Sequence, residues 1–280
     1  MTLTTAGVLM ADAARRSRAV PAFNVITLEQ AEAVVAGAMD AGIPVLLQVS
    51  QNAIAFRSGF APLLAACREL AAAAALPIGV HVDHLEDDAL TRAIIARSAE
   101  LGVGSIMFDA ASRAHTENAA ATKSIVAEGH AVGLWVEGEL GEIGGKDGAH
   151  APGVRTDPGE AVSFVGETGV DALAVAVGST HAMRDRSARL DLDLIARLAA
   201  ALPVPLVLHG SSGVDDGMLA DAVAAGIRKV NIGTALAIAG TAALRHELAA
   251  RPDAVDPRSY LRGVRSATQD AVARLAAVAG

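Results

Sequence analysis

The chain alternates between short apolar runs and longer stretches in which apolar residues recur with helical spacing. The short runs are almost continuously apolar, which is typical of parallel strands that are covered on both faces. We predict strands at Val20–Val25, Val45–Val49, Ile78–Asp83, Gly104–Phe108, Ala131–Glu137, Ala172–Val177, Val204–Leu208 and Lys229–Ile232.

The alanine-rich stretches between these runs predict helices. Several start after a capping residue, as at Thr27 and Asp157, and several end at a glycine, as at Gly42 and Gly169. We predict helices at Leu28–Ala41, Pro62–Ala75, Asp87–Glu100, Glu117–Glu128, Pro158–Thr168, Leu192–Ala201, Asp216–Ala225 and Ala235–Ala249, and terminal helices at Thr5–Arg16 and Arg258–Ala277.

Eight strand–helix units in 280 residues leave about 35 residues per unit, the size of one β–α step. A (β/α)8 barrel needs about 250 residues, and the two terminal helices account for the surplus. The alternative is an open doubly wound sheet, but no G-x-G-x-x-G turn follows the first strand. We therefore predict an α/β protein in which residues 1–280 form a single TIM (β/α)8 barrel with extra N- and C-terminal helices.

Composition narrows the classes of partner. The formal net charge is −8, which argues against nucleic acid or an anionic membrane as a partner. Cys67 is the single cysteine, so no intramolecular disulfide can form, as is usual in a reducing compartment. No apolar run reaches the ~20 residues of a membrane span, and residues 1–10 lack the features of a secretory signal. We expect a soluble, cytoplasmic protein.

Three histidines stand at the carboxyl ends of predicted strands, and in a barrel these ends meet at one mouth. His84, His181 and His209 are separated by 97 and then 28 residues. Three imidazoles with an open fourth position form a catalytic zinc site, whereas each histidine alone could be a hydrogen-bonded structural residue. No short ligand motif such as H-E-x-x-H is present, so spacing leaves both interpretations open.

Other polar residues share the predicted mouth. Asp83 precedes His84 and is well placed for proton transfer. Asp109, Glu137 and Glu139 could bind a second cation, order the histidines or be solvated.

Small residues follow the last two predicted strands, at Gly210–Gly213 and Asn231–Thr234. Their backbone N–H groups and the next helix N-terminus favour an anion, and these loops are the recurrent phosphate site of TIM barrels. The long segment Glu139–Asp157 is rich in Gly and predicts a lid or binding loop, with a surface insertion as the alternative.

Seven short motifs follow one another along the chain: Pro21–Asn24 (PAFN), His81–His84 (HVDH), Glu137–Gly141 (EGELG), Gly144-Gly145, Val177–His181 (VGSTH), His209–Ser212 (HGSS) and Asn231–Thr234 (NIGT). This ordered set resembles the class II, zinc-dependent ketose-bisphosphate aldolases over nearly the whole chain. The resemblance implies an aldolase that reversibly cleaves a phosphorylated ketose, of the fructose- or tagatose-1,6-bisphosphate type. The products would be dihydroxyacetone phosphate and an aldehyde, formed through a zinc-stabilised enediolate.

The resemblance also assigns roles to residues. His84, His181 and His209 would hold one catalytic Zn²⁺, and Asp109 and Glu139 match positions at which relatives bind a second metal. A monovalent cation is a further option, and a homodimer or homotetramer is expected. Asp83 would be the acid/base at the C4 hydroxyl. The positions implied for substrate and phosphate binding are Asn24, Ser50, Ala182, Gly210, Ser211, Ser212, Asn231, Ile232, Gly233 and Thr234.

Three positions depart from the family pattern. Asp147 stands where the mobile loop of relatives carries a glutamate base, and it would have to serve as the base here. Ala182 replaces a glycine that contacts the substrate, and Gly233 replaces an aspartate of fructose-bisphosphate-specific relatives. These changes keep the reaction class and leave the sugar open.

Several alternatives follow from these departures. The chain could be an aldolase for another phosphorylated sugar or sugar acid, a metal-dependent sugar isomerase or epimerase, or a non-catalytic companion subunit. A Schiff-base mechanism needs a lysine at the mouth. Of Lys123, Lys146 and Lys229, just Lys229 is on a predicted strand, at the end away from the mouth. We predict that Lys229 is structural or solvated.

Overall fold

The computed structural model describes residues 3–140, 154–179 and 186–280. In these residues eight parallel strands, β2 to β9, close into a barrel, because β9 pairs with β2 and β4 pairs with β5. A short strand β1 adds to the start of β4. The strands are β1 (Leu3–Thr4), β2 (Val20–Asn24), β3 (Val45–Ser50), β4 (Ile78–Leu85), β5 (Val103–Phe108), β6 (Trp135–Leu140), β7 (Ala172–Val175), β8 (Leu206–Leu208) and β9 (Ile227–Ile232).

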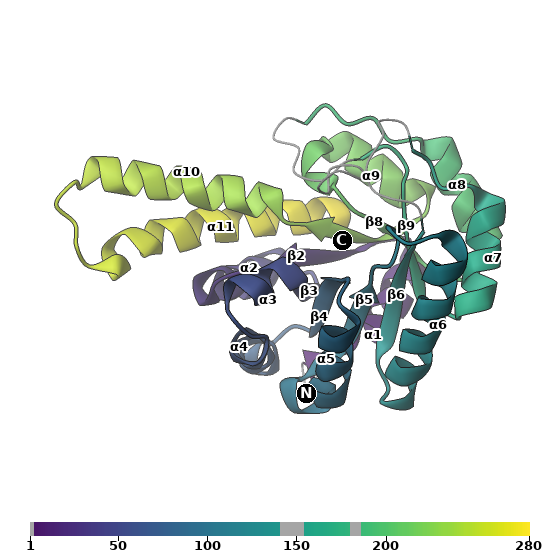
Figure 1. Cartoon of the computed structure of the whole chain (residues 1–280). Coiled ribbons are helices and arrows are strands. Elements are labelled where there is room, and N and C mark those ends of the chain that lie inside the picture. The colour runs from purple at the N-terminus through teal and green to yellow at the C-terminus, as the bar shows by residue number, and fades with distance from the viewer. Residues whose placement is uncertain (1–2, 141–153, 180–185) are drawn as a thin grey trace.

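Helices surround the barrel and separate successive strands (Figure 1). They are α1 (Ala6–Arg15), α2 (Leu28–Ala41), α3 (Gln51–Phe56), α4 (Ala61–Ala73), α5 (Asp88–Leu101), α6 (His115–Ala131), α7 (Pro158–Thr168), α8 (Leu192–Ala201), α9 (Asp216–Ala225), α10 (Thr234–Ala250) and α11 (Pro257–Ala279), with a short 3-10 turn η1 (Ser211–Gly213).

The predicted TIM barrel is confirmed, and α2, α7, α8 and α9 have the predicted bounds. The predicted start of one strand, Ala131, is wrong. Helix α6 continues to Ala131, and the chain then turns at Gly133, which has a positive φ of 80°, before β6 begins. The small helix α3 was not predicted, and the Ser50 hydroxyl caps it by accepting from the Ala53 N–H at 3.2 Å.

The barrel packs against two different surroundings. Its outer face and the helices share the main apolar core, and α1 covers the amino-terminal end of the barrel. Leu9 and Met10 of α1 are buried against Leu46, with Trp135 of β6 packed beside them. The carboxyl ends of the strands are therefore the end that is left for a site.

Helices α10 and α11 form a long hairpin that extends away from the barrel, and α11 returns to pack against α2 (Figure 1). In the part of the chain that the structure describes, no helix combines the length and apolar character needed to cross a membrane.

Candidate active site

The inward faces of β3, β4 and β5 carry polar side chains. Paired residues of parallel strands point to the same side, and the register pairs Gln48 with His81 and His81 with Ser105. All three side chains are fully buried. TIM barrels usually fill this space with branched apolar residues, so the polar filling indicates a function.

The end of β4 turns two adjacent polar side chains into the mouth. The pairing of β4 with β5 slips between Val82 and Leu85, and His84 has a left-handed φ of 48°. Such a conformation costs a non-glycine residue about 1–3 kcal/mol and is concentrated at functional sites. Because of this irregularity, Asp83 and His84 both reach the mouth, which a regular strand would not allow.

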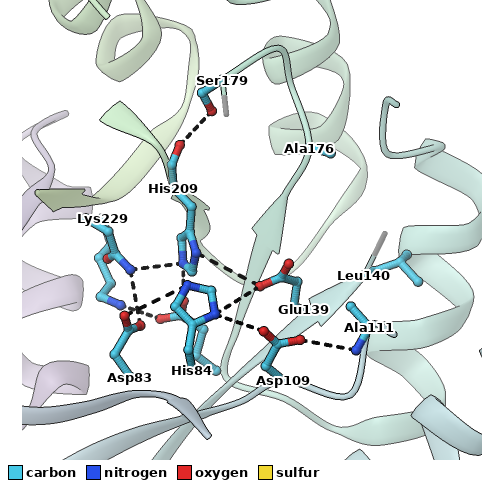
Figure 2. A network of polar contacts seen from close by, with 12 residues as sticks. Asp83, His84, Asp109, Ala111, Glu139, Leu140, Ala176, Ser179, His209 and Lys229 are labelled. Atoms are coloured by element: carbon cyan, nitrogen blue, oxygen red, sulfur yellow. Dashed lines mark hydrogen bonds and ion pairs between the residues drawn. The ribbon is translucent and has the colours of Figure 1, made fainter. Parts of the chain in front are cut away.

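Asp83, His84 and His209 converge at the mouth (Figure 2). Each offers a ligand atom, and these atoms lie within 4.8 Å of one another. The rings of His84 and His209 meet edge to face, with centroids 4.7 Å apart and an interplanar angle of 79°. The His84 Nε2 lies 3.9 Å from Asp83 Oδ2.

Asp109 and Glu139 contact the other side of His84. Asp109 Oδ2 is 2.9 Å from His84 Nδ1, and Glu139 Oε2 is 3.7 Å from the same nitrogen. The carboxylates are 5% and 2% exposed, so the interpretation that they are solvated is wrong. Asp109 also accepts a hydrogen bond from the Ala111 N–H at 3.2 Å, which fixes its carboxylate beside the ring (Figure 2).

A charged network lies beneath these residues. Lys229 is fully buried, and its Nζ is 2.7 Å from Glu137 Oε2 and 3.3 Å from His81 Nε2. Glu137 is fully buried as well. Because Lys229 is buried in an ion pair, the prediction that it is solvated is wrong and the prediction that it is structural holds. The other oxygen, Glu137 Oε1, is 3.1 Å from His209 Nε2.

His81 belongs to this network and not to the mouth. Its Nδ1 is 2.8 Å from Ser105 Oγ. Burial first, and the charge of Lys229 second, lower the pKa of His81 well below its ordinary value. His81 is therefore neutral, with Nε2 able to accept from the ammonium and Nδ1–H able to donate to the hydroxyl.

The two predicted phosphate loops lie side by side. Gly210, between β8 and the turn η1, is in the left-handed region with a φ of 68°, and Ser211 donates a hydrogen bond to the Asn231 carbonyl. The Ser212 hydroxyl accepts from the Ala235 N–H at 3.0 Å. It thereby caps α10, whose own N-cap Gly233 has no side chain to do so.

The remaining predicted substrate contacts have local partners too. Asn24 Oδ1 accepts from Gln48 Nε2 at 3.0 Å, and Asn231 Nδ2 is 3.3 Å from Asp83 Oδ1. The side chain of Ile232 is 2% exposed and packs in the main core. The structure describes Thr234 as the first residue of α10. Three predicted site residues, Asp147, His181 and Ala182, lie outside the described residues.

Some polar residues near the site were not predicted as site residues. They are Gln48, Ser105, Lys229 and Gln51, whose Oε1 accepts from the N–H groups of Glu86 and Asp87 after β4. For Lys229 a signal existed, because it lies two positions before Asn231. Residues two apart on a strand share its inward face.

The fold and this cluster define a TIM-barrel enzyme with its polar site at the carboxyl ends of the strands. The family model "Fructose-bisphosphate aldolase class-II" matches residues 4–280. The chain is 35% identical over 276 residues to the D-tagatose-1,6-bisphosphate aldolase subunit GatY of Klebsiella oxytoca, covering 97% of this chain and 95% of the relative.

Solved structures of aldolases resemble this chain as well. The YdjI aldolase from Escherichia coli K12 has a TM-score of 0.84 at 29% identity, covering 99% of this chain and 97% of that chain. Fructose-bisphosphate aldolase from Campylobacter jejuni has a TM-score of 0.80 at 20% identity, covering 96% and 92%, a likeness of fold. The chain belongs to the class II fructose-bisphosphate aldolase family, as the sequence motifs predicted. It is an aldolase, a carbon–carbon lyase of carbohydrate metabolism.

Proposed function

We propose that this aldolase cleaves a phosphorylated ketose of the fructose- or tagatose-1,6-bisphosphate type with the help of one divalent metal ion, Zn²⁺. The observation that carries the proposal is the convergence of Asp83, His84 and His209 at the mouth of the barrel, with ligand atoms within 4.8 Å of one another. Family membership supports the reaction, and the 35% identical relative named for D-tagatose 1,6-bisphosphate supports the sugar class.

The donor atoms present fit a zinc ion. Zinc prefers imidazole nitrogens, and a catalytic site holds it with three protein ligands and one open position. His84 and His209 supply two such rings around a common centre, and we propose His181 as the third ligand. A bound ion would act as a Lewis acid on the substrate carbonyl, so no covalent imine with a lysine is needed.

Asp109 is proposed to orient His84 and not to bind a second ion. Its Oδ2 lies 2.9 Å from His84 Nδ1, the distance of a hydrogen bond that leaves Nε2 for the metal. Glu139 is farther from the same nitrogen, at 3.7 Å, so a second cation held by His84, Asp109 and Glu139 is the alternative arrangement.

Asp83 is proposed to carry the proton of the C4 hydroxyl. Its carboxylate is 2% exposed, and Asn231 Nδ2 lies 3.3 Å from Oδ1, while Oδ2 faces His84. A carboxylate held in this way can take a proton from a substrate hydroxyl and return it without competition from bulk water. Asp147 is the proposed base for the proton next to the carbonyl in the condensation direction.

The loops at Gly210–Ser212 and Gly233–Thr234 are proposed to bind a substrate phosphate. Backbone N–H groups at the start of α10 would face the anion. Binding remote from the reacting bond fixes the orientation of the substrate.

The test combines metal analysis with product analysis. The purified protein should contain about one zinc per chain, cleave ketose 1,6-bisphosphates to two trioses, lose turnover in EDTA and regain it with zinc. Borohydride with substrate should leave turnover intact, because a Schiff-base enzyme would be inactivated. A product that keeps its six-carbon skeleton would indicate an isomerase or epimerase, and zero turnover with zinc bound would indicate a companion subunit.

A further inference from the structure

The molecule buries a lysine–carboxylate pair directly beneath the proposed metal site, and neither residue has a part in the chemistry proposed above. We propose that Lys229 and Glu137 are positioning residues, which hold His209 in the tautomer and orientation that it needs to bind the metal. This inference rests on the proposed metal site and deepens it.

Glu137 bridges two groups from neighbouring strands. Its side chain and that of Lys229 are both 0% exposed. Glu137 Oε2 is 2.7 Å from Lys229 Nζ, and Oε1 is 3.1 Å from His209 Nε2. One carboxylate from β6 therefore connects an ammonium on β9 with an imidazole that follows β8.

This contact determines which nitrogen of His209 can face a metal. A neutral imidazole carries one proton, and a metal binds the nitrogen that lacks it. A carboxylate beside Nε2 accepts the proton's hydrogen bond and keeps the proton there. Asn231 Nδ2 lies 3.0 Å from the same nitrogen, but an amide N–H only donates and cannot bond a protonated Nε2. In this tautomer the amide donates instead to Asp83 Oδ1, 3.3 Å away. Nδ1 is the other ring nitrogen, 4.0 Å from Glu139 Oε2, and in this proposal it is the one that binds the metal.

Lys229 fixes the position of the carboxylate, with Nζ 2.7 Å from Glu137 Oε2. A buried carboxylate without a cation is strongly unfavourable, and the ammonium compensates it. Lys229 Nζ is also 3.3 Å from His81 Nε2, and His81 Nδ1 is 2.8 Å from Ser105 Oγ. The pair is thus held from the far side of the barrel interior as well.

Stability alone does not account for the pair. Replacing a buried ion pair with apolar residues of similar volume is often neutral or stabilising. A barrel interior that served packing alone would therefore need no charges at this depth. The feature that an apolar pair could not reproduce is the acceptor beside His209 Nε2.

The test is the double variant Lys229→Met/Glu137→Met, which removes both charges and leaves unbranched apolar side chains. We expect it to fold and to bind zinc about 10- to 100-fold more weakly than wild type, measured by competition with a chromophoric chelator. Glu137→Gln keeps an acceptor oxygen and should fall between the two. His130→Ala, which removes a surface histidine that is 43% exposed and lies outside the network, is the control and should keep the wild-type Kd.

A second measurement needs no variant. In metal-free protein labelled with ¹⁵N-histidine, the neutral His209 ring should carry its proton on Nε2, and the double variant should lose this preference. A wild-type His209 protonated on Nδ1 would overturn the inference, as would a folded double variant with the wild-type Kd. Wild-type protein that binds no zinc would instead overturn the proposed function, so the two failures are distinct.

Discussion

Strands β4 and β7 belong to the same barrel, and their outward faces are alike. Val80 and Val82 of β4, and Leu173 and Val175 of β7, are all fully buried in the core between the barrel and its helices. Burying a side chain of this kind contributes about 1.5–3 kcal/mol. Both strands therefore hold the fold together through the face that points away from the site.

The inward faces of the two strands differ in polarity. β4 presents His81 and Asp83 to the interior, whereas β7 presents Ala172 and Ala174, which pack with Met107 in a small apolar cluster. The polar residues of β4 make hydrogen bonds that reach β5 and β9, and the alanines of β7 make none through their side chains.

The contrast separates the part of the barrel that specifies the fold from the part that specifies the chemistry. Since the outward core stabilises both strands, the inward face of β4 is able to carry charged groups. Changes to the inward polar face should therefore affect metal binding and turnover, and changes to the outward apolar face should affect stability.

The largest effect is expected for His209→Ala. Removing the imidazole deletes a proposed metal ligand, so bound zinc and turnover should be lost together in a protein that still folds. Metal analysis and a triose-release assay on the same sample measure both. His130→Ala is the control, because His130 is 43% exposed and pairs with Asp171 on the surface. Zinc content at the wild-type level in His209→Ala would contradict the ligand role.

Asp83→Asn should retain zinc and lose turnover. The amide keeps the shape of the carboxylate and cannot take the proton, which typically costs about 10²- to 10⁴-fold in rate. The comparison of kcat with bound zinc in one preparation checks this. A kcat close to wild type would remove Asp83 from the acid/base role, and a loss of zinc would indicate that it is a ligand instead.

The sequence was sufficient to predict the fold and the ends of strands that carry the site, because both depend on local patterns. Alternation between apolar runs and alanine-rich helices predicted the barrel. The positions of His84 and His209 at strand ends predicted their meeting, and their rings are 4.7 Å apart. Their role as metal ligands stays a prediction.

Two features could not be predicted from the pattern. The left-handed φ of His84 arises from a slip in the pairing of β4 with β5, which depends on the neighbouring strand and not on the residues of β4 alone. The partners of Lys229 could not be predicted from the position of its Cα on the strand. Its four-carbon stem lets Nζ reach Glu137 and His81 higher in the barrel.

Leu173→Ala tests the outward face. Truncating this fully buried side chain should lower the free energy of unfolding by about 2–5 kcal/mol, while kcat per folded molecule stays unchanged. Denaturant unfolding measures the first quantity. Val162→Ala on α7 is the control, since Val162 is 46% exposed and should change stability by no more than about 0.5 kcal/mol. A selective loss of kcat in Leu173→Ala would contradict the division between the two faces.

The buried thiol of Cys67 offers an independent measure of unfolding in the same two variants. Burial raises the pKa of its thiol to about 12, and the thiolate is the reactive form. The native protein should therefore resist thiol reagents at pH 8, and labelling should follow unfolding. Because the folded pKa is raised, stability from this group is complete below the pKa of the unfolded thiol and declines as the pH rises from there towards 12. Leu173→Ala should label faster than wild type, and Val162→Ala should not.

The smallest effect is expected at the start of α2, on the outside of the barrel. Thr27 accepts a hydrogen bond from the Gln30 N–H at 3.2 Å, and Gln30 Oε1 in turn accepts from the Thr27 N–H at 3.3 Å. Thr27→Ala removes the first of these bonds and should cost about 1 kcal/mol of stability. Thr27→Ser keeps the cap and should restore most of it. Neither variant should alter kcat or zinc affinity, because α2 reaches the barrel through the outward core; a change in either would show that stability and chemistry are not separated by face.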